Sequence, residues 1–337
     1  MLRVHIKNNH YRPDTFPNTA QGEKVFTITQ QRFDAASLNH PDVARELDLS
    51  IGWDTDQFEK HMAAADVLVT WDLPTEGLAK VAPNLKWIHI IGAGVEHLAP
   101  MDWLPTEVVL TNNKGVHAKK GGEFGIMSIL MLHNHMPQLI HNQREAKYDS
   151  LYSTPIAGKT LVIIGTGSIG QSVAQQAKAM GVYVIGVSRH GHKVPEVDEA
   201  VSVKDLARVL PRGDFGFVVT PLTDETVNLI DERRLGLMKP GAGLVNIGRA
   251  AVVDYDALAV KLLDGSVSGA ILDVFDPEPL PADSRFWKVP NLIVTPHISA
   301  DDGNAYVSLT LELFFNNMRR LINGEALQNQ VNTRLGY

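Results

Sequence analysis

The feature that most constrains this chain is a short apolar run that is followed at once by regularly spaced glycines. Residues 161–164 read Leu-Val-Ile-Ile, the pattern of a β-strand that is buried on both faces. The motif that follows is Gly165-Thr166-Gly167-Ser168-Ile169-Gly170, with the glycine spacing G-x-G-x-x-G. Residues 171–180 are rich in helix formers, and a second strand pattern at 182–187 completes a β-α-β unit. This order of elements predicts a parallel sheet with a glycine-rich turn at the end of one strand.

Each glycine of the motif has a separate physical role in a turn that holds a dinucleotide. One permits the tight turn, one lets the backbone approach a pyrophosphate, and one lets the helix pack closely on the strand. The N-terminus of the helix adds unpaired N–H groups that attract an anion. The spacing alone is a weak signal, since an ordinary strand-to-helix turn can carry it. The strands and the helix around it favour a dinucleotide site.

The residues after the second strand predict which dinucleotide is bound. An NAD site usually places an Asp or Glu about 20 residues beyond the last glycine, where it binds the 2′-hydroxyl of the ribose. Here Ser188 and Arg189 occupy that region, and no carboxylate stands beside them. A hydroxyl beside a guanidinium suits a 2′-phosphate, because Arg forms paired, charge-assisted hydrogen bonds to phosphate oxygens. We therefore expect NADP(H) to be preferred over NAD(H), and the alternative is a solvated basic loop.

Composition and charge narrow the class of protein further. At 337 residues the chain suggests about two domains, and its 44% hydrophobic and 20% charged residues are those of an ordinary globular protein. The net charge of -7 argues against a general nucleic-acid binder. The absence of cysteine removes disulfides, thiolate nucleophiles and cysteine-based metal sites. The sequence shows no signal peptide and no apolar run of membrane-spanning length, so we expect a soluble, cytoplasmic protein without nucleic-acid or membrane partners.

Residues 1–117 alternate strand-like and helix-like patterns, which predicts a small parallel sheet flanked by helices. The expected strands are 2–6, 24–28, 65–70, 85–91 and 108–111, and the expected helices are 57–64 and 76–81. This part contains one glycine-rich turn after a strand, Ile91-Gly92-Ala93-Gly94-Val95. Such a turn can present consecutive N–H groups to an anion, here a substrate carboxylate, and the alternative is a plain tight turn.

Residues 118–146 form one long helical pattern with two glycines near its start, which permit a bend where the chain changes domain. His133 and His135 lie two residues apart and do not share a helix face, so we expect packing or interface roles for them. No metal site is expected.

The remaining chain predicts how the domains are connected. Helix and strand patterns alternate again after the β-α-β unit, and the apolar spacing of residues 306–322 predicts a helix that returns to the first domain. We therefore expect a substrate domain of residues 1–117 plus 301–337 and a dinucleotide-binding domain of residues 118–300. The chemistry would take place in the cleft between them.

Three segments downstream of the glycine motif end predicted strands with an ionisable side chain, namely Arg249, Glu278 and His297. Ligands of open α/β sheets gather at the carboxyl ends of strands, so this placement predicts a shared site. Hydride transfer to a carbonyl requires a hydride carrier, a proton donor tuned near neutrality and a cation beside the carbonyl. We expect His297 to supply the proton, Glu278 to orient the ring and raise its pKa, and Arg249 to hold the substrate carboxylate. The alternatives are a loop histidine, a surface glutamate and an ion pair between Arg249 and Asp254.

These motifs together resemble the D-isomer-specific 2-hydroxyacid dehydrogenase family, and within it the glyoxylate/hydroxypyruvate reductases. The segments that carry the resemblance are the Gly165/Gly167/Gly170 motif, Thr220-Pro-Leu-Thr223, Asn246-Ile-Gly-Arg249, Asp273-Val-Phe-Asp-Pro-Glu-Pro-Leu280 and Thr295-Pro-His297. They cover most of residues 85–300 in family order. The chain departs from the family pattern at Ala250, where a glycine is usual, and it lacks a tryptophan that members often carry near residues 147–148.

The resemblance implies two doubly wound parallel-sheet domains, a Rossmann dinucleotide-binding domain inserted into a flavodoxin-like substrate domain. It implies Arg249, Glu278 and His297 as the catalytic set and residues 91–95 as the loop that binds the substrate carboxylate. Beyond the glycine motif, Ser188 and Arg189, the implied cofactor-binding residues are Thr220, Pro221, Thr226, Ile247, Gly248 and Asp273, the last as a contact of the nicotinamide amide. The resemblance also implies a homodimer, with the helix after residue 118 at its interface, and closure of the cleft around the substrate.

The expected function is therefore hydride transfer between NADP(H) and a small 2-keto or 2-hydroxy acid with D specificity. One alternative is a nucleotide-sensing binding protein like the related transcriptional corepressors, against which the complete set of three ionisable residues argues. Another alternative is an enzyme similar to D-3-phosphoglycerate dehydrogenase. Formate dehydrogenases of this fold place Gln where Glu278 stands, which disfavours them. The sequence leaves the substrate, the physiological direction and the pathway open.

Overall fold

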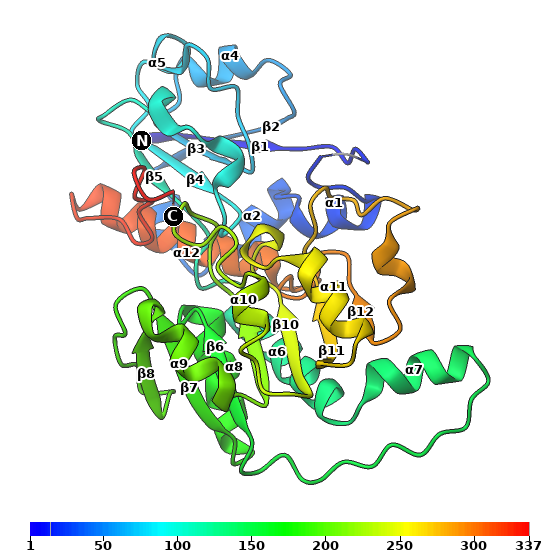
Figure 1. The fold of residues 1–337 in the computed structure, drawn as a ribbon. Helices are drawn as coiled ribbons and strands as arrows, with labels where there is room; N and C mark the ends of the chain where they lie inside the picture. The colour runs from blue at the N-terminus through cyan, green and yellow to red at the C-terminus, as the bar shows by residue number, and fades with distance from the viewer. Residues whose placement is uncertain (14, 337) are drawn as a thin grey trace. The chain divides into compact units, whose positions relative to one another are not determined.

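The computed structural model describes residues 1–13 and 15–336, which form two compact units (Figure 1). The discontinuous unit comprises Met1–Val116 and Asp302–Tyr337, and the inserted unit comprises His117–Asp301. Each unit is built around one parallel sheet, so the predicted pair of doubly wound α/β domains is confirmed. In the part of the chain that the structure describes, none of the helices combines the length and the apolar character that a membrane crossing requires.

The discontinuous unit contains a five-stranded sheet in the order β2-β1-β3-β4-β5, the strand order of flavodoxin-like folds. The strands are β1 (Leu2–Asn8), β2 (Leu47–Trp53), β3 (Val67–Thr70), β4 (Trp87–Ile90) and β5 (Val109–Thr111). The helices are α1 (Ala20–Phe26), α2 (Gln30–Ser37), α3 (Pro41–Ala44), α4 (Phe58–Met62), α5 (Leu78–Val81) and α12 (Tyr306–Ile322).

The sheet of the discontinuous unit is apolar on both faces, because successive side chains of each strand enter opposite cores. Trp87 of β4 packs in the core that α2, α3 and α12 cover, where it stacks on Phe314 of α12. Its neighbour Ile88 enters the second core, which Phe58 of α4 and Leu78 of α5 complete. The unbroken apolar runs of these strands therefore follow from burial on both sides.

One prediction for this unit is wrong, and one strand was not predicted. Residues 24–28 were expected to form a strand, but α1 covers most of this range, and Thr19 caps it by accepting a hydrogen bond from the Gly22 N–H. The β-branched residues near the end of the segment 24–28 are typical of a strand. The N-cap at Thr19 and the polar residues that follow this cap stabilise a helix instead. The strand at the edge of the sheet beside β1 is instead β2, for which no strand was predicted, while the predicted β3 pairs with the other side of β1.

The inserted unit contains a seven-stranded sheet in the order β12-β11-β10-β9-β6-β7-β8. The strands are β6 (Thr160–Ile164), β7 (Tyr183–Ser188), β8 (Glu199–Ser202), β9 (Phe215–Val218), β10 (Ala242–Asn246), β11 (Val267–Leu272) and β12 (Leu292–Val294). The helices are α6 (Ala118–His133), α7 (Met136–Arg144), α8 (Ser168–Ala179), α9 (Leu206–Val209), α10 (Glu232–Leu235) and α11 (Tyr255–Leu263). The chain runs outward from β6 to β8 and returns to build the other half from β9, so the order of strands reverses between β6 and β9. Such a switch point is where open α/β sheets bind dinucleotides.

Short 3₁₀ helices complete both units. They are Glu96–Leu98, Met101–Trp103, Val203–Asp205, Leu210–Arg212, Ala250–Val252 and Arg285–Lys288.

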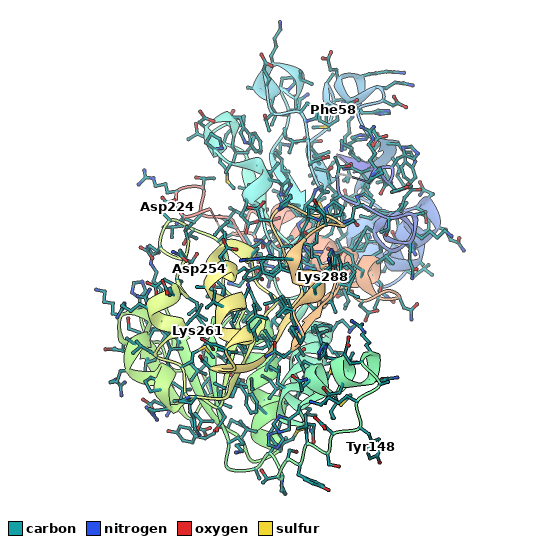
Figure 2. All side chains as sticks on the ribbon, turned by 45° about the vertical axis from the view of Figure 1, so that its right-hand side comes forward. Phe58, Tyr148, Asp224, Asp254, Lys261 and Lys288 are labelled. Atoms are coloured by element: carbon teal, nitrogen blue, oxygen red, sulfur yellow. The ribbon has the colours of Figure 1, made fainter. Side chains whose placement is uncertain are left out.

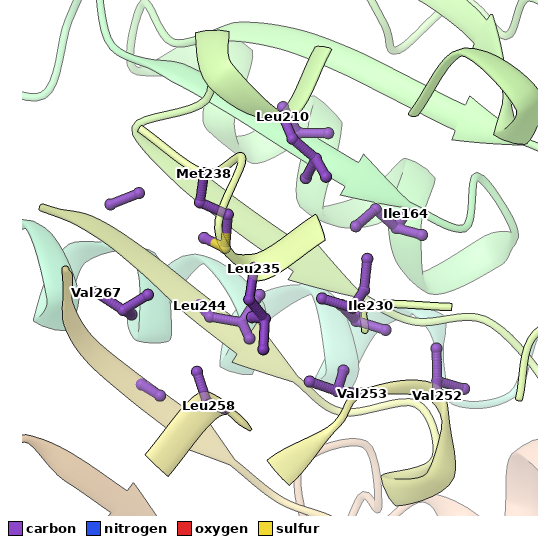
Figure 3. Close-up of a cluster of buried hydrophobic side chains, with 14 of the residues drawn as sticks. Ile164, Leu210, Ile230, Leu235, Met238, Leu244, Val252, Val253, Leu258 and Val267 are labelled. Atoms are coloured by element: carbon purple, nitrogen blue, oxygen red, sulfur yellow. The ribbon is translucent and has the colours of Figure 1, made fainter. Parts of the chain in front are cut away.

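Both faces of the larger sheet are also covered. Val162 and Ile164 of β6 enter one core, and Leu161 and Ile163 enter the other. Figure 3 shows the first core, in which Leu235 of α10 lies beside strand β10.

The long helix predicted over residues 118–146 is in fact two helices. Asn134 and His135 separate α6 from α7, with His135 in the left-handed region at φ 55° and Pro137 in the first turn of α7. The bend was expected at the two glycines near the start, and this is wrong. Gly122 instead serves close packing, because a Cβ atom there would lie 2.0 Å from the Ser172 Oγ of α8.

Candidate active site

The glycine-rich turn after β6 has the geometry that dinucleotide binding requires. Gly165 adopts φ 113°, and a Cβ atom there would lie 2.6 Å from the Val219 carbonyl oxygen. Gly170 packs α8 against the turn, because its Cβ would lie 2.0 Å from the Gly165 carbonyl oxygen. Gly167 is the N-cap of α8, and apart from its two chain neighbours no heavy atom of the described residues lies within 4 Å of where its Cβ would stand. A phosphate can therefore approach the backbone at Gly167 and the free N–H groups of α8.

The loops after β9 and β10 line the same switch point. Gly248 packs on Thr220, since a Cβ at Gly248 would lie 2.8 Å from the Thr220 carbonyl oxygen, and Ile247 beside it is buried. The Thr220 Oγ1 is buried and has no hydrogen-bond partner among the described residues. A buried hydroxyl without a partner is costly, so this one is suited to a bound polar group.

Thr226 has a structural role in the turn that follows β9. Its hydroxyl accepts a hydrogen bond from the Thr223 N–H at 2.7 Å and donates one to the Pro221 carbonyl at 2.8 Å. The side chain therefore fixes the shape of the turn 221–226, in which Pro221 and Thr226 were expected to bind the cofactor.

Ser188 and Arg189 lie where β7 ends, as the sequence predicts for residues beside the adenosine ribose. The Ser188 hydroxyl accepts a hydrogen bond from the Gly191 N–H at 3.1 Å. The Arg189 guanidinium forms an ion pair with Glu225, which the sequence analysis did not single out. Arg189 therefore already has a carboxylate neighbour, although that residue lies 36 positions away in the chain.

His297 and Glu278, which were predicted to act together, are hydrogen-bonded. The Nδ1 atom of His297 lies 2.8 Å from one Glu278 carboxylate oxygen, and the other oxygen accepts a hydrogen bond from the Phe275 N–H at 2.7 Å. His297 adopts the left-handed backbone conformation at φ 54°, which is unfavourable for a residue with a side chain. The His297 side chain is 46% exposed. The ring is thus held at Nδ1, and Nε2 is the nitrogen left for an external group.

The electrostatics of this pair favour a protonated ring beside a carboxylate. Burial lowers the pKa of His297, but the hydrogen bond and the negative charge of Glu278 outweigh burial and raise this pKa above its ordinary value. Burial raises the pKa of Glu278, and the hydrogen bond and charge of His297 outweigh it, so that this pKa is lowered. The pair therefore keeps a proton on the imidazole over a wider pH range than a free histidine would.

Arg249 belongs to the same cluster. It follows β10, where Asn246 donates a hydrogen bond to the Arg249 carbonyl at 3.0 Å, and its Nη1 donates to the Gly248 carbonyl at 2.8 Å. Its positive charge lowers the pKa of both His297 and Glu278. Asp254, the alternative partner, caps α11 by accepting a hydrogen bond from the Ala257 N–H. The three predicted catalytic residues are therefore brought together within the inserted unit.

Asp273 holds the loop that carries His297. The His297 N–H donates to the Asp273 carbonyl at 2.8 Å. One carboxylate oxygen of Asp273 accepts hydrogen bonds from the Thr295 hydroxyl and the Ile298 N–H, and the other accepts from the Ser299 N–H. The predicted contact with the nicotinamide amide stays a prediction, whereas this role in positioning the loop was missed by the sequence analysis.

His117 and Asp301 are two further titratable neighbours of His297 that the sequence analysis did not select. Their side chains lie 3.6 Å apart, and the His117 ring is also 3.3 Å from the Ala300 carbonyl oxygen. Burial lowers the pKa of His117 to about 4 and raises the pKa of Asp301 to about 6, while the charge of His297 lowers the latter. In the described residues no group of three or more His, Cys, Asp or Glu side chains is arranged to hold a metal ion.

The predicted carboxylate loop, residues 91–95, belongs to the discontinuous unit and follows β4. Gly92 lies against Trp71, since a Cβ there would be 2.2 Å from the indole ring, and Trp71 stacks on His97 at 4.2 Å. Trp71 and His97 also line a cavity of about 700 Å³ in this unit, together with Trp103.

Comparisons with known proteins agree with this geometry. The family model of the D-isomer specific 2-hydroxyacid dehydrogenase NAD binding domain matches residues 126–299. A glyoxylate reductase of Thermococcus litoralis is 32% identical over 280 residues, which cover 79% of this chain and 83% of that protein. A D-3-phosphoglycerate dehydrogenase of Synechocystis is 30% identical over 241 residues, which cover 71% of this chain and 43% of that protein.

Among solved structures, the NADPH-dependent glyoxylate/hydroxypyruvate reductase of Sinorhizobium meliloti, in complex with NADP and sulfate, is similar over the whole chain. The two share 25% identity with a TM-score of 0.81, and the match covers 100% of both chains. The chain therefore belongs to the D-isomer-specific 2-hydroxyacid dehydrogenase family and is an NAD(P)-dependent oxidoreductase.

Proposed function

We propose that this protein is an NADP(H)-linked reductase of small 2-keto acids, with glyoxylate and hydroxypyruvate as the substrates to test first. The observation that carries the proposal is the 2.8 Å hydrogen bond between His297 and Glu278, in the same unit as the glycine-rich turn. The names of similar proteins, glyoxylate reductase and glyoxylate/hydroxypyruvate reductase, support this substrate class.

The proposed chemistry assigns one task to each residue of the cluster. When bound, the reduced nicotinamide supplies the hydride that reaches the keto carbon. His297 donates the proton on Nε2 to the carbonyl oxygen, while Glu278 keeps Nδ1 hydrogen-bonded and stabilises the charged ring. The Arg249 guanidinium holds the substrate carboxylate and polarises the carbonyl. The product is the 2-hydroxy acid, and residues 91–95 are the loop proposed to bind the carboxylate through backbone N–H groups.

Replacement of His297 by Ala tests the proton transfer. We expect kcat for glyoxylate reduction to fall by roughly 10²- to 10⁴-fold, the usual contribution of a positioned acid, while the Kd for NADPH stays unchanged. His141→Ala, at a half-buried position on α7, is the control and should retain full activity. Normal turnover in the His297→Ala variant would refute the proposed role.

The preference for NADP(H) over NAD(H) rests on Ser188, Arg189 and the absence of a carboxylate at the expected ribose position. We expect Arg189→Ala to lower the ratio of kcat/KM for NADPH to that for NADH by roughly tenfold or more, since a charge-assisted contact to the 2′-phosphate is lost. Removing the negative charge of Glu225 with Glu225→Gln should raise this ratio a few-fold, because the carboxylate beside Arg189 repels the phosphate. A clear preference of the unmodified protein for NADH would overturn this assignment.

The substrate class is tested with a panel of keto acids and both cofactors. Glyoxylate, hydroxypyruvate, pyruvate, a bulkier 2-keto acid and a phosphorylated 2-keto acid cover the alternatives. The similarity to a D-3-phosphoglycerate dehydrogenase makes the phosphorylated compound a serious second candidate. Binding of NADPH without reduction of any member of the panel would favour a nucleotide-sensing protein instead.

We also propose that the protein is a homodimer through α6 and α7. An apolar groove of about 710 Å³ lies on these helices and is lined by Ile126, Met127, Leu130, Met131, Leu139 and Leu151. After α7 the chain extends away from the inserted unit (Figure 1), and the Tyr148 side chain on this segment projects into solvent (Figure 2). Apolar surface of this kind is typical of subunit interfaces. Light scattering should give the mass of a dimer, and Met131→Asp should give that of a monomer.

A further inference from the structure

The first three carbonyl groups of the proposed carboxylate loop, those of residues 91–93, are tied to buried donors of the discontinuous unit. The Ile91 carbonyl accepts hydrogen bonds from the Asn113 Nδ2 at 2.5 Å and from the Tyr306 hydroxyl at 2.6 Å. The Gly92 carbonyl accepts from the Asn113 backbone N–H at 2.9 Å. The Ala93 carbonyl accepts from the Asn112 Nδ2 at 2.8 Å. Three consecutive carbonyl oxygens are therefore held on the buried side of the loop.

The donors on this buried side are themselves fixed. Asn113, Tyr306 and Thr310 are each at most 3% exposed. The Asn113 amide also donates to the Thr310 hydroxyl at 2.8 Å, and that hydroxyl donates to the Tyr306 carbonyl at 2.9 Å on the same helix, α12. A continuous set of hydrogen bonds thus connects the segment after β5, helix α12 and the loop.

The N–H groups of the loop have the opposite arrangement. Among the described residues, no acceptor is hydrogen-bonded to the backbone N–H of Gly92, Ala93, Gly94 or Val95. Consecutive N–H groups of a turn form a concave anion site when their carbonyls are directed elsewhere. N–H groups whose orientation is already fixed also bind a negative charge more strongly, because no free energy is spent on reorienting them when the ligand binds.

We propose that Asn113 and Tyr306, with Asn112, are positioning residues that hold the loop carbonyls so that its N–H groups face the substrate carboxylate. This inference rests on the proposed function, in which residues 91–95 bind that carboxylate. None of the three residues needs to touch the substrate. Without them the peptide groups of the loop are free to rotate, and a carbonyl oxygen that turns toward the carboxylate repels it.

The experiment compares Tyr306→Phe and Asn113→Ala with Asn291→Ala. Asn291 is the matched control, because it is also a buried asparagine whose amide donates to backbone carbonyls, at the Leu262 and Ser268 positions of the inserted unit. We expect KM for the keto acid to rise roughly tenfold in Tyr306→Phe and more in Asn113→Ala, with kcat and the Kd for NADPH within about twofold of the unmodified protein. Asn291→Ala should lower thermal stability without changing KM.

Binding of oxamate, a carboxylate that is not reduced, provides the second readout. Its Kd in the presence of NADPH, measured by calorimetry, should rise in proportion to KM in both loop variants. Equal Kd values for oxamate in Tyr306→Phe, Asn113→Ala and the unmodified protein would overturn the proposal, as would a KM change of the same size in Asn291→Ala. If the unmodified protein binds oxamate but reduces no keto acid, the proposed function fails while this inference is still decided by the oxamate series. Tyr306→Phe removes only one hydroxyl, so it serves if Asn113→Ala does not fold.

Discussion

At the scale of single residues, the chemistry of this site depends on one carboxylate that controls the protonation of one imidazole. Glu278 raises the pKa of His297 against the opposing effect of burial. A group whose pKa is raised stays protonated to higher pH, so reduction, which needs the protonated ring, should persist above the ordinary pKa of histidine and be lost as pH rises through the raised value. In Glu278→Gln the raising effect is gone while burial remains, and the pKa of His297 falls.

We therefore expect the alkaline limb of the pH profile of kcat/KM for reduction to move to lower pH in Glu278→Gln. The loss of rate should be small in acid and grow toward roughly 100-fold at alkaline pH, since the proton donor is then absent. Burial also raises the pKa of Asp301, a neighbour of His297, to about 6, so a change of rate near that pH is expected if its charge acts on the ring. An unshifted alkaline limb in Glu278→Gln would contradict the assigned role of Glu278. Asp301→Asn shows whether changes near pH 6 come from that carboxyl group.

At the scale of elements, the close contact of α6 with α8 decides how the glycine-rich turn is supported. Gly122 and Gly125 of α6 approach α8, because a Cβ at these positions would lie 2.0 Å from the Ser172 Oγ and 2.4 Å from the Val173 Cγ2. Since α8 begins at the turn, any displacement of α8 moves the N–H groups that are expected to bind the pyrophosphate.

Gly122→Ala should therefore destabilise the protein by about 1–3 kcal/mol and raise the Kd for NADPH, because overpacking forces the two helices apart. Gly236→Ala is the matched control. Gly236 has φ −67°, and the nearest atoms to a Cβ there are 3.4 Å away, so the substitution fits without strain. Thermal denaturation and a cofactor titration measure both effects. Equal stability of the two variants would show that α6 and α8 can move apart at Gly122 without a loss of unfolding free energy, which would contradict this prediction.

At the scale of the whole molecule, three buried histidines couple stability to pH. Burial is the largest cause that lowers the pKa of His5, His89 and His117, each to about 4. In the unfolded chain these histidines are protonated with the ordinary pKa of 6.5. Between about pH 6.5 and pH 4 the unfolded chain therefore binds more protons than the folded protein. Stability is therefore fully present above this window and is lost as pH falls through it, by about 1.4 kcal/mol per pH unit for each histidine. Asp301 acts in the opposite direction, because its raised pKa favours the folded state at low pH.

We expect the urea midpoint of unfolding to decrease steadily between pH 6.5 and pH 4.5. His89→Asn should reduce this dependence on pH, because the variant has no proton to take up at that position on unfolding. His190→Asn, at an exposed position, should leave the dependence unchanged. A midpoint that stays constant over this range would contradict the linkage.

The sequence by itself determined those structural features that depend only on residues close together in the chain. The strand, glycine turn and helix of residues 160–179 follow from local pattern. Gly165 has φ 113°, and at Gly165 and Gly170 other backbone atoms approach so closely that only glycine fits. The placement of Arg249, Glu278 and His297 after strands was also readable, since parallel strands end at a common edge. The pairing of Glu278 with His297 spans 19 residues and was predicted because proton transfer needs such a partner.

The tertiary structure decided what depends on residues that are remote in sequence. The helix at α1 in place of a strand and the break between α6 and α7 were settled by capping and packing rather than by periodicity. Glu225 beside Arg189, Asp273 beneath the His297 loop, and Asn113 with Tyr306 behind residues 91–95 are side chains whose partners lie far along the chain. A local pattern carries no signal for such contacts, because hydrogen bonds and ion pairs form between groups that only the folded sheets bring within about 3 Å of each other.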